Sequence, residues 1–88
     1  MPVKDTVETV VRTIVEHARI RPPEVQEHHV LTRDLGFDSL AMLLTLGDLE
    51  QRLGFEYPVE RLDDLSTISV AELIGMVRVD SARRQVGS

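Results

Sequence analysis

The sequence contains no cysteine and no tryptophan, and its only aromatic residues are Phe37, Phe55 and Tyr57. Without cysteine there can be no disulfide and no thiolate zinc site, and a reducing compartment is compatible. No apolar run is long enough to cross a membrane, and the N-terminus lacks the apolar stretch of a secretory signal. With so few rings, Leu, Val and Ile must build the core, which favours helices packed on helices. We therefore expect a cytoplasmic all-α protein.

Basic residues are in the minority, with 10 Lys and Arg against 15 Asp and Glu and a net charge of −5. This balance argues against nucleic acid as a main partner. Residues 33–64 hold eight acidic and three basic residues and so account for the whole net charge. The acidic segment is either an ordinary solvated face or a docking surface for basic partners.

Conventional catalytic and metal-binding patterns are missing as well. His17 lies in an expected helix, and the adjacent His28 and His29 cannot share a helical face. No neighbouring groups complete a ligand set, so we expect solvated or structural roles for all three and no metal site. The scattered glycines exclude a glycine-rich phosphate loop. A triad of Ser39, Asp38 and a loop histidine is disfavoured because so small a bundle has little room for a substrate cleft. No catalytic residue is assigned.

Apolar periodicity predicts a first helix over about residues 5–19, with Asp5 as its N-cap and Glu8 completing an acidic capping box. Pro22 prevents the helix from continuing. Residues 20–38 show no sustained period and are predicted to form a long loop, an unusual feature in so small a domain. Four apolar side chains can hold this loop to the core: Val30, Leu31, Leu35 and Phe37.

A second helix is predicted from Ser39 to about Leu53, with Asp38 as N-cap and Gly54 just after its end. Its core stripe consists of Met42, Leu46, Leu49 and Leu53. A second apolar stripe contains Leu40, Leu43, Leu44 and Gly47, and a polar strip contains Ala41, Thr45, Asp48 and Arg52. A surface helix needs only one apolar stripe. The helix is therefore central to the bundle, or its second stripe meets another molecule, or both.

The C-terminal third predicts a short helix and a longer one. Residues 59–65 form the short helix after Pro58, with Leu62 and Leu65 facing inward. Ser69 and Glu72 form a capping box, and Ile68 and Leu73 the accompanying hydrophobic staple, for a helix to about Val79. The whole is one domain spanning residues 1–88: three main helices, one short helix and a long loop, with a folded core at about 5–79 and a frayed tail at 80–88.

Ser39 has an unusual position, at the first turn of a helix that follows the long loop. Such helix starts are common, and by itself this one needs no functional explanation. However, the free N–H groups of a first turn favour a phosphate, although Asp38 would oppose it electrostatically. Nothing next to Ser39 in the sequence would activate it as a nucleophile. The serine is therefore interpreted as a site that another enzyme modifies.

The segment Asp34-Leu35-Gly36-Phe37-Asp38-Ser39-Leu40 resembles the attachment signature of acyl carrier proteins, Leu-Gly-x-Asp-Ser-Leu, within a matching helix and loop pattern over about residues 5–79. The resemblance implies that a phosphopantetheinyl transferase uses coenzyme A and a divalent metal to attach a 4′-phosphopantetheine arm to Ser39. The thiol of the arm then holds an acyl group as a thioester, and partner enzymes perform the chemistry. The implied partners are this transferase, an acyl-loading enzyme and a ketosynthase or other pathway enzymes, acting on a monomer.

In this family the second helix, the preceding loop and the short third helix form the docking face. By position, the implied docking residues are Asp38, Leu40, Ala41, Leu43, Leu44, Gly47, Glu50, Gln51, Glu60, Asp63 and Asp64. Fatty-acid carriers usually have acidic residues where this chain has Ala41 and Leu44. Losing these charges weakens steering and gives apolar fit more weight.

We therefore favour a carrier of a polyketide or hybrid pathway. A fatty-acid carrier and an aminoacyl or peptidyl carrier are the alternatives within the family. An unmodified helical interaction domain is the alternative from another class.

Overall fold

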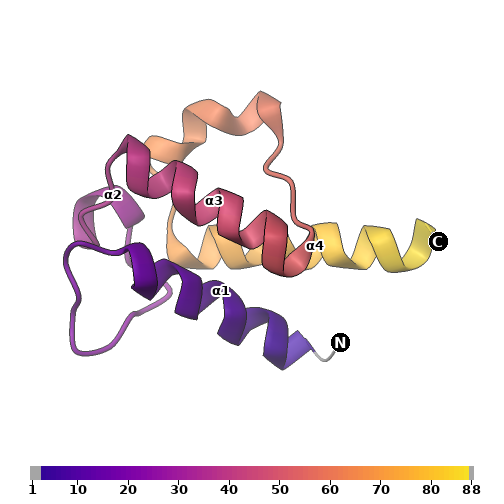
Figure 1. The fold of residues 1–88 in the computed structure, drawn as a ribbon, viewed down its shortest axis with the longest axis horizontal. Coiled ribbons are helices and arrows are strands. Elements are labelled where there is room, and N and C mark those ends of the chain that lie inside the picture. The colour runs from indigo at the N-terminus through magenta and orange to yellow at the C-terminus, as the bar shows by residue number, and fades with distance from the viewer. Residues whose placement is uncertain (1–2, 88) are drawn as a thin grey trace.

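The computed structural model describes residues 3–87, with side-chain burial for residues 6–83, and these residues form helices and no β-strand (Figure 1). The elements are α1 (Val3–His17), α2 (Leu31–Asp34), α3 (Ser39–Leu53), the 3₁₀ helix η1 (Val59–Ser66) and α4 (Val70–Gly87). The predicted all-α class is confirmed. Within the described range, no helix has the length and apolar character needed to span a membrane.

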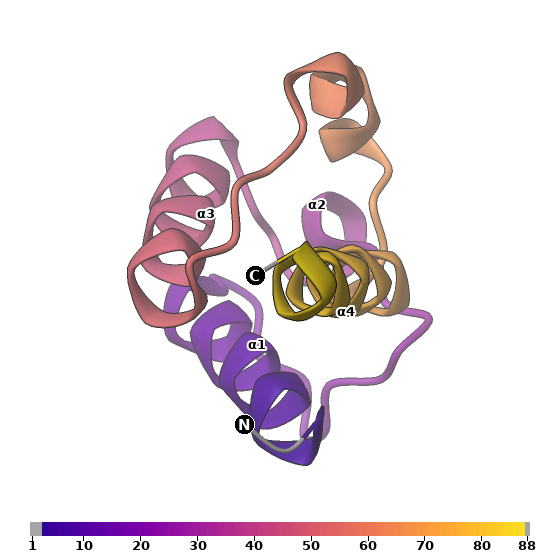
Figure 2. The ribbon, with the colours of Figure 1, turned by 90° about the vertical axis from the view of Figure 1, so that its right-hand side faces the viewer.

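The core lies where α1 packs against both α3 and α4 (Figure 2). Its largest fully buried apolar side chains are Phe55, Ile14, Leu31, Leu35, Leu49, Leu73, Val10, Val70 and Val77. Aliphatic residues thus fill the core almost alone, as the composition predicts. Burying a side chain of this size stabilises the fold by about 1.5–3 kcal/mol.

The apolar stripe of the predicted first helix is buried at Val10 and Ile14 in α1 and at Ala18 just after it. Its bounds differ from the prediction, because it begins at Val3 and ends at His17. Asp5 therefore lies inside the helix, and the prediction that it is the N-cap is wrong. The Ala18 amide still donates to the Ile14 carbonyl at 2.9 Å, so the last turn closes near the predicted end.

Helix α3 has the predicted ends. Oδ1 of the N-cap Asp38 accepts a hydrogen bond from the Ala41 amide at 2.8 Å. Gly54 adopts the left-handed conformation with a φ of 69°, which favours glycine, and its amide donates to the Glu50 carbonyl at 2.8 Å. Met42 and Leu49 of the predicted core stripe are buried, and Leu46 and Leu53 are partly buried.

The polar strip of α3 faces α1. Ala41 and Thr45 are buried, with 5% and 0% of their surface exposed, and the Thr45 hydroxyl donates to the Ala41 carbonyl at 2.8 Å. One turn further on, Asp48 Oδ2 lies 2.6 Å from His17 Nε2. Arg52 then donates to both carboxylate oxygens of Glu16, at 3.0 and 2.8 Å.

The two helices can approach closely because the strip of α3 has small side chains, Ala41 and Thr45, at one end. At its other end, Asp48 and Arg52 pair with side chains of α1. Packing against α1 therefore decides the orientation of α3, rather than the polarity of its side chains alone. The predicted central position of this helix follows, and both of its faces are now accounted for. One packs on the bundle, and the other, the second apolar stripe, is exposed.

The long loop is more ordered than its lack of periodicity predicts. It contains the short helix α2, and an isolated antiparallel bridge joins Val30 to Ser69. Leu31, Leu35 and Phe37 are buried, which confirms that they hold this segment to the core, and Val30 is partly buried. The single turn of α2 is too short to leave an apolar period in the sequence, so pattern analysis misses it.

The short helix η1 is confirmed, but its predicted inward face is only half right. Leu65 packs partly buried against the core, whereas Leu62 is 50% exposed. The element is a 3₁₀ helix with a non-helical Arg61 inside it, so an α-helical periodicity does not apply. No residue of η1 is buried.

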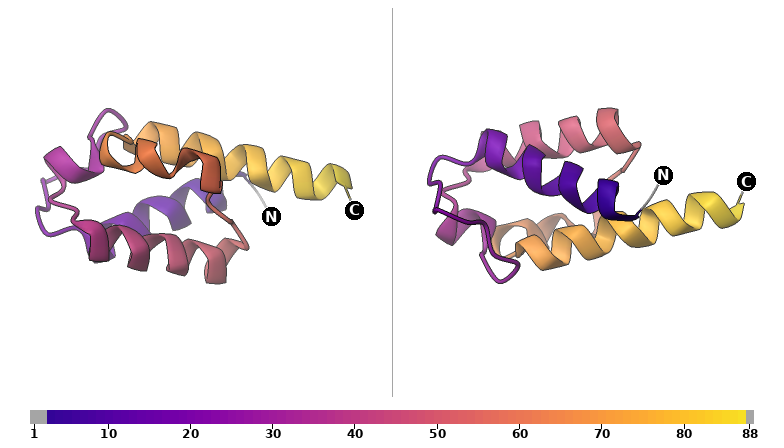
Figure 3. Two further views of the ribbon diagram at one scale, coloured as in Figure 1. Left: turned by 90° about the horizontal axis from the view of Figure 1, so that it is seen from above. Right: turned by 90° about the horizontal axis from the view of Figure 1, so that it is seen from below.

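Helix α4 starts as predicted. The Ser69 amide donates to Glu72 Oε1 at 3.0 Å, and the Glu72 amide donates to Ser69 Oγ at 3.1 Å, which is the reciprocal capping box. Ile68 and Leu73, the predicted staple, are both buried. The helix does not stop near Val79 but continues to Gly87, so residues 80–87 are helical where a frayed tail was expected. Figure 3 shows this last part projecting beyond the bundle. Ser88 lies outside the described residues.

Candidate functional site

Ser39 is the first residue of α3, and its side chain is exposed. The Asp38 carboxylate caps the amide of Ala41, three residues further along, and the intrahelical series begins with Met42 donating to the Asp38 carbonyl at 2.9 Å. The amides of Ser39 and Leu40 therefore remain as the unpaired donors that open every α-helix. An anion attached to Ser39 would lie in a favourable field.

The segment before Ser39 fixes the start of α3 against the end of α1. The amides of Arg19 and Ile20 both donate to the Leu35 carbonyl at 3.1 Å. Gly36 has a φ of 68°, and a Cβ added there would lie 3.0 Å from Ile20 Cγ1 and 3.3 Å from Arg19 Cβ. This close approach explains why glycine is needed in the segment. The chain thus reaches Ser39 along a fixed path.

A side chain that sequence reasoning missed lies at this site. Arg19 Nη2 is 2.7 Å from Asp38 Oδ2, which forms an ion pair between the end of α1 and the N-cap of α3. The two residues are far apart in the sequence and belong to no common period, so no local pattern identifies the pair. The only hint was the expectation that the Asp38 charge would oppose a phosphate on Ser39.

Asp34 begins the signature segment and stabilises its loop. A hydrogen bond from the Arg33 guanidinium, and then one from the Val30 amide at 2.7 Å, lower the pKa of the Asp34 carboxyl below its ordinary value. Because the folded-state pKa is the lower one, this contribution to stability is present above the ordinary carboxyl pKa and is lost as the pH falls through the folded value.

We expect Asp34→Asn to flatten the loss of thermal stability below about pH 4, measured as melting temperature at stepped pH values. The matched control is Asp63→Asn, at an exposed aspartate of η1. An acid limb in Asp34→Asn as steep as in the wild type would contradict this role.

A cavity of about 530 Å³ opens directly beside Ser39, between α3 and η1. Its apolar walls come from both helices and from the loop, and it is lined by Thr32, Phe37, Asp38, Ser39, Met42, Leu43, Leu62, Leu65 and Ser66. The Thr32 hydroxyl donates to the Ser66 carbonyl at 2.8 Å and ties α2 to the end of η1. An exposed hydroxyl beside an apolar-walled cavity fits an arm that carries an organic group.

Most of the residues implied as a docking face are exposed on α3 and η1. They are Asp38, Leu40, Leu43, Leu44, Gly47, Glu50 and Gln51, with Glu60, Asp63 and Asp64 on η1. Ala41 is the exception, because it is buried against α1 and offers no side chain to a partner. The three leucines have exposures of 58%, 66% and 49%, large values for apolar side chains.

The charge of this face is lower than the sequence count indicates. Asp48 pairs with His17 on the opposite side of α3, Asp38 pairs with Arg19, and Asp64 pairs with Arg61 Nε at 2.8 Å. The unshared carboxylates of the face, among the side chains described, are Glu50, Glu60 and Asp63. The centre of the face is therefore apolar, with acidic groups toward its edges.

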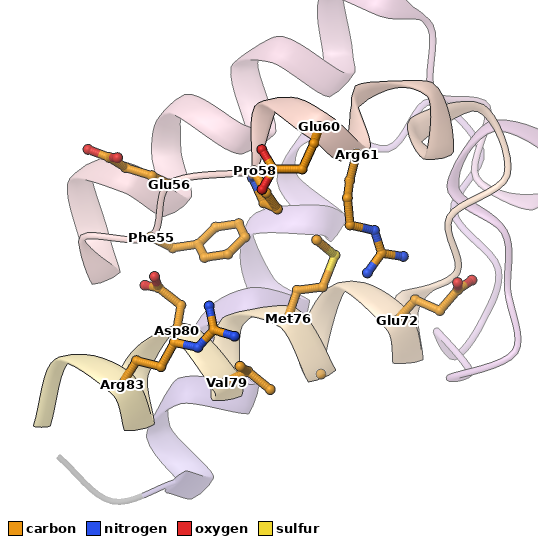
Figure 4. Close-up of a pocket in the computed structure, with 11 residues that line it drawn as sticks. Phe55, Glu56, Pro58, Glu60, Arg61, Glu72, Met76, Val79, Asp80 and Arg83 are labelled. Carbon is orange, nitrogen blue, oxygen red and sulfur yellow. The ribbon is translucent and has the colours of Figure 1, made fainter. Parts of the chain in front are cut away.

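A second cavity, of about 540 Å³, lies between α4, η1 and the segment that follows α3 (Figure 4). Phe55, Pro58, Met76 and Val79 provide its apolar surface, with Arg61 and Arg83 among the charged side chains around it. Ser39 is at the other end of α3, and none of the residues that line this cavity lines the one beside Ser39. This cavity is therefore separate from the one beside Ser39.

The three histidines have local partners. His17 pairs with Asp48, the rings of His28 and His29 lie 4.7 Å apart, and His29 Nδ1 accepts a hydrogen bond from the Gln26 amide at 2.9 Å. In the described part of the chain, no group of three or more histidine or acidic residues could hold a metal ion.

A helical bundle that presents one serine at a helix start, next to an apolar-walled cavity, is suited to carrying a group. Residues 8–77 match the family model described as phosphopantetheine attachment site, and the chain belongs to this family. Proteins of this class are non-catalytic carriers of a phosphopantetheine arm, and this chain is such a carrier.

Two of the curated relatives are acyl carrier proteins. The chain is 31% identical over 67 residues to the acyl carrier protein of Zymomonas mobilis, covering 76% of this chain and 86% of that protein. It is 33% identical over 55 residues to the acyl carrier protein of Wolinella succinogenes, covering 62% and 72% of the two chains. No solved structure matches the chain significantly.

Proposed function

We propose that Ser39 is the attachment residue and that its 4′-phosphopantetheine arm, derived from coenzyme A, carries acyl intermediates as thioesters. The observation that carries the proposal is the exposed Ser39 hydroxyl at the N-terminus of α3, with unpaired amides behind it and a cavity beside it. The bound arm would supply the thiol. The chain itself would hold the phosphodiester at the positive end of α3 and present the cargo to other proteins.

Incubating the protein with coenzyme A, Mg²⁺ and a broad-specificity phosphopantetheinyl transferase should add the mass of one arm, and Ser39→Ala should abolish the gain completely. Ser66→Ala is the matched control, because Ser66 is exposed and lines the same cavity. Intact mass spectrometry gives the readout, and circular dichroism shows that both variants fold. If wild type gains no mass, or Ser39→Ala still does, the attachment proposal fails and the unmodified interaction domain becomes the better interpretation.

We further propose that the carrier serves a dedicated polyketide or hybrid pathway rather than housekeeping fatty-acid synthesis. Leu40, Leu43 and Leu44 support this, since they place apolar surface at the centre of the face beside Ser39. Apolar surface at the centre of an interface favours close fit over long-range charge steering. A fatty-acid carrier and an aminoacyl carrier are the competing assignments.

The same proposal includes the setting in which the carrier works. It would act as a single domain and a monomer in the cytoplasm, with a phosphopantetheinyl transferase, an acyl-loading enzyme and a ketosynthase or other pathway enzymes as its partners. Glu50, Glu60 and Asp63 at the edges of the docking face would attract basic residues of these enzymes.

A further inference from the structure

Arg19 has a place at the modification site that neither the family match nor the sequence assigns. Its Nη2 atom lies 2.7 Å from Oδ2 of Asp38, while Oδ1 of the same carboxylate caps the Ala41 amide at 2.8 Å. Asp38 immediately precedes Ser39. The guanidinium is therefore held next to the first turn of α3, although it comes from the other side of the long loop.

The backbone fixes where the Arg19 side chain begins. Its amide donates to the Leu35 carbonyl, and so does the amide of Ile20, both at 3.1 Å. Gly36 packs against the same point, where an added Cβ would lie 3.3 Å from Arg19 Cβ. The Arg19 side chain itself is 62% exposed, so its guanidinium is reachable from solvent. The backbone and Cβ of Arg19 are therefore held in place, and its guanidinium is accessible.

The charges at this turn favour a nearby cation once Ser39 is modified. A phosphodiester on Ser39 is an anion one residue from the Asp38 carboxylate, and like charges so close oppose each other. A guanidinium has five N–H donors in a planar fork, so it can bind a carboxylate and a phosphate oxygen together. Arg21, two residues further on, has only a long contact of 3.5 Å to the Glu16 carbonyl.

We propose that Arg19 is a positioning residue for the arm: it offsets the charge of Asp38 and holds the phosphodiester attached to Ser39. This inference rests on the proposed function of Ser39. In this role a residue just after α1 orients the arm. The Leu35–Gly36 segment holds Arg19 in place.

The test compares the unmodified and arm-bearing forms of the wild type, Arg19→Gln, Arg19→Lys and the matched control Arg21→Gln. Each protein is converted fully by long incubation with the transferase, which is checked by intact mass. Melting temperatures are measured at about 0.01 M and about 1 M salt, where charge interactions are long-ranged and strongly screened respectively. The ³¹P chemical shift of the arm-bearing forms reports directly on the environment of the phosphodiester.

We expect attachment of the arm to lower the melting temperature of Arg19→Gln by about 2–4 °C more than that of the wild type at low salt. This extra penalty should shrink at high salt, largely disappear in Arg19→Lys, and be absent in Arg21→Gln. The ³¹P shift should move in Arg19→Gln alone. Adding Asp38→Asn to Arg19→Gln keeps an N-cap acceptor and should remove the extra penalty.

A merely structural Arg19–Asp38 pair would lower the melting temperatures of both forms equally and leave the ³¹P shift unchanged, and that result would overturn the inference. Failure of the wild type to acquire the arm would instead overturn the proposal for Ser39. The two failures are therefore distinguishable in the same set of samples.

Discussion

Leu44→Glu should reduce kcat/KM of the native partner enzymes with the arm-bearing carrier by about tenfold or more, while leaving the fold intact. Leu44 is 49% exposed on the apolar stripe of α3 that includes Leu40. A partner surface shaped for leucine would have to desolvate the new carboxylate, and burying an unpaired charge is costly. The measurement is acyl transfer to or from the carrier by a ketosynthase or loading enzyme of its own pathway.

Gln51→Glu is the matched control for this substitution, because it adds the same charge to an exposed position of the same helix face, about two turns beyond Leu44. It should change kcat/KM less than about threefold, as expected for a charge at the edge of an interface. The same variants assayed with a fatty-acid ketosynthase separate the two pathways. If fatty-acid enzymes turn over Leu44→Glu as well as the wild type or better, and no enzyme of another pathway shows reduced turnover of this variant, a fatty-acid carrier is favoured.

Gly36→Ala and Gly47→Ala should have opposite effects on stability. At Gly36, a φ of 68° disfavours alanine, and the new Cβ would meet Ile20 Cγ1 at 3.0 Å and Arg19 Cβ at 3.3 Å. The exposed Ile20 side chain can turn away, but the Arg19 Cβ is fixed by the backbone. We expect Gly36→Ala to lower the free energy of unfolding by about 1–3 kcal/mol.

Gly47 is in the middle of α3, and nothing lies within 4 Å of a Cβ added there. Alanine at this position should raise the free energy of unfolding by up to about 1 kcal/mol through helix propensity alone. Urea denaturation of the two variants gives the comparison. Equal effects of the two substitutions would contradict the close approach assigned to Gly36. A stabilised Gly47→Ala with impaired partner turnover would mean that a partner needs the missing side chain.

Features encoded within a few neighbouring residues could be predicted from the sequence. The Asp38 cap, the Gly54 terminus and the Ser69–Glu72 capping box depend on hydrogen bonds within one turn, so a short window contains all the partners. The candidate attachment serine was found for the same reason, because its signature is continuous in the chain.

Features that depend on a second element could not be predicted. The burial of Ala41 and Thr45 requires knowing that α1 lies over them, and the orientation of Leu62 requires knowing that η1 is a 3₁₀ helix. The Arg19–Asp38 pair depends on the path of the whole intervening loop. Helical periodicity shows that a face exists but does not show which neighbour covers it.

The 3₁₀ helix η1, which buries none of its own residues, has a consequence for the cavity beside Ser39. A segment held by few buried contacts opens at a small free-energy cost compared with unfolding of the whole domain. One wall of that cavity, on the side of Leu62 and Leu65, belongs to such a segment, while the opposite wall belongs to the firmly packed α3. The width of this cavity can therefore change through movement of η1 while the packing of α1, α3 and α4 stays as it is.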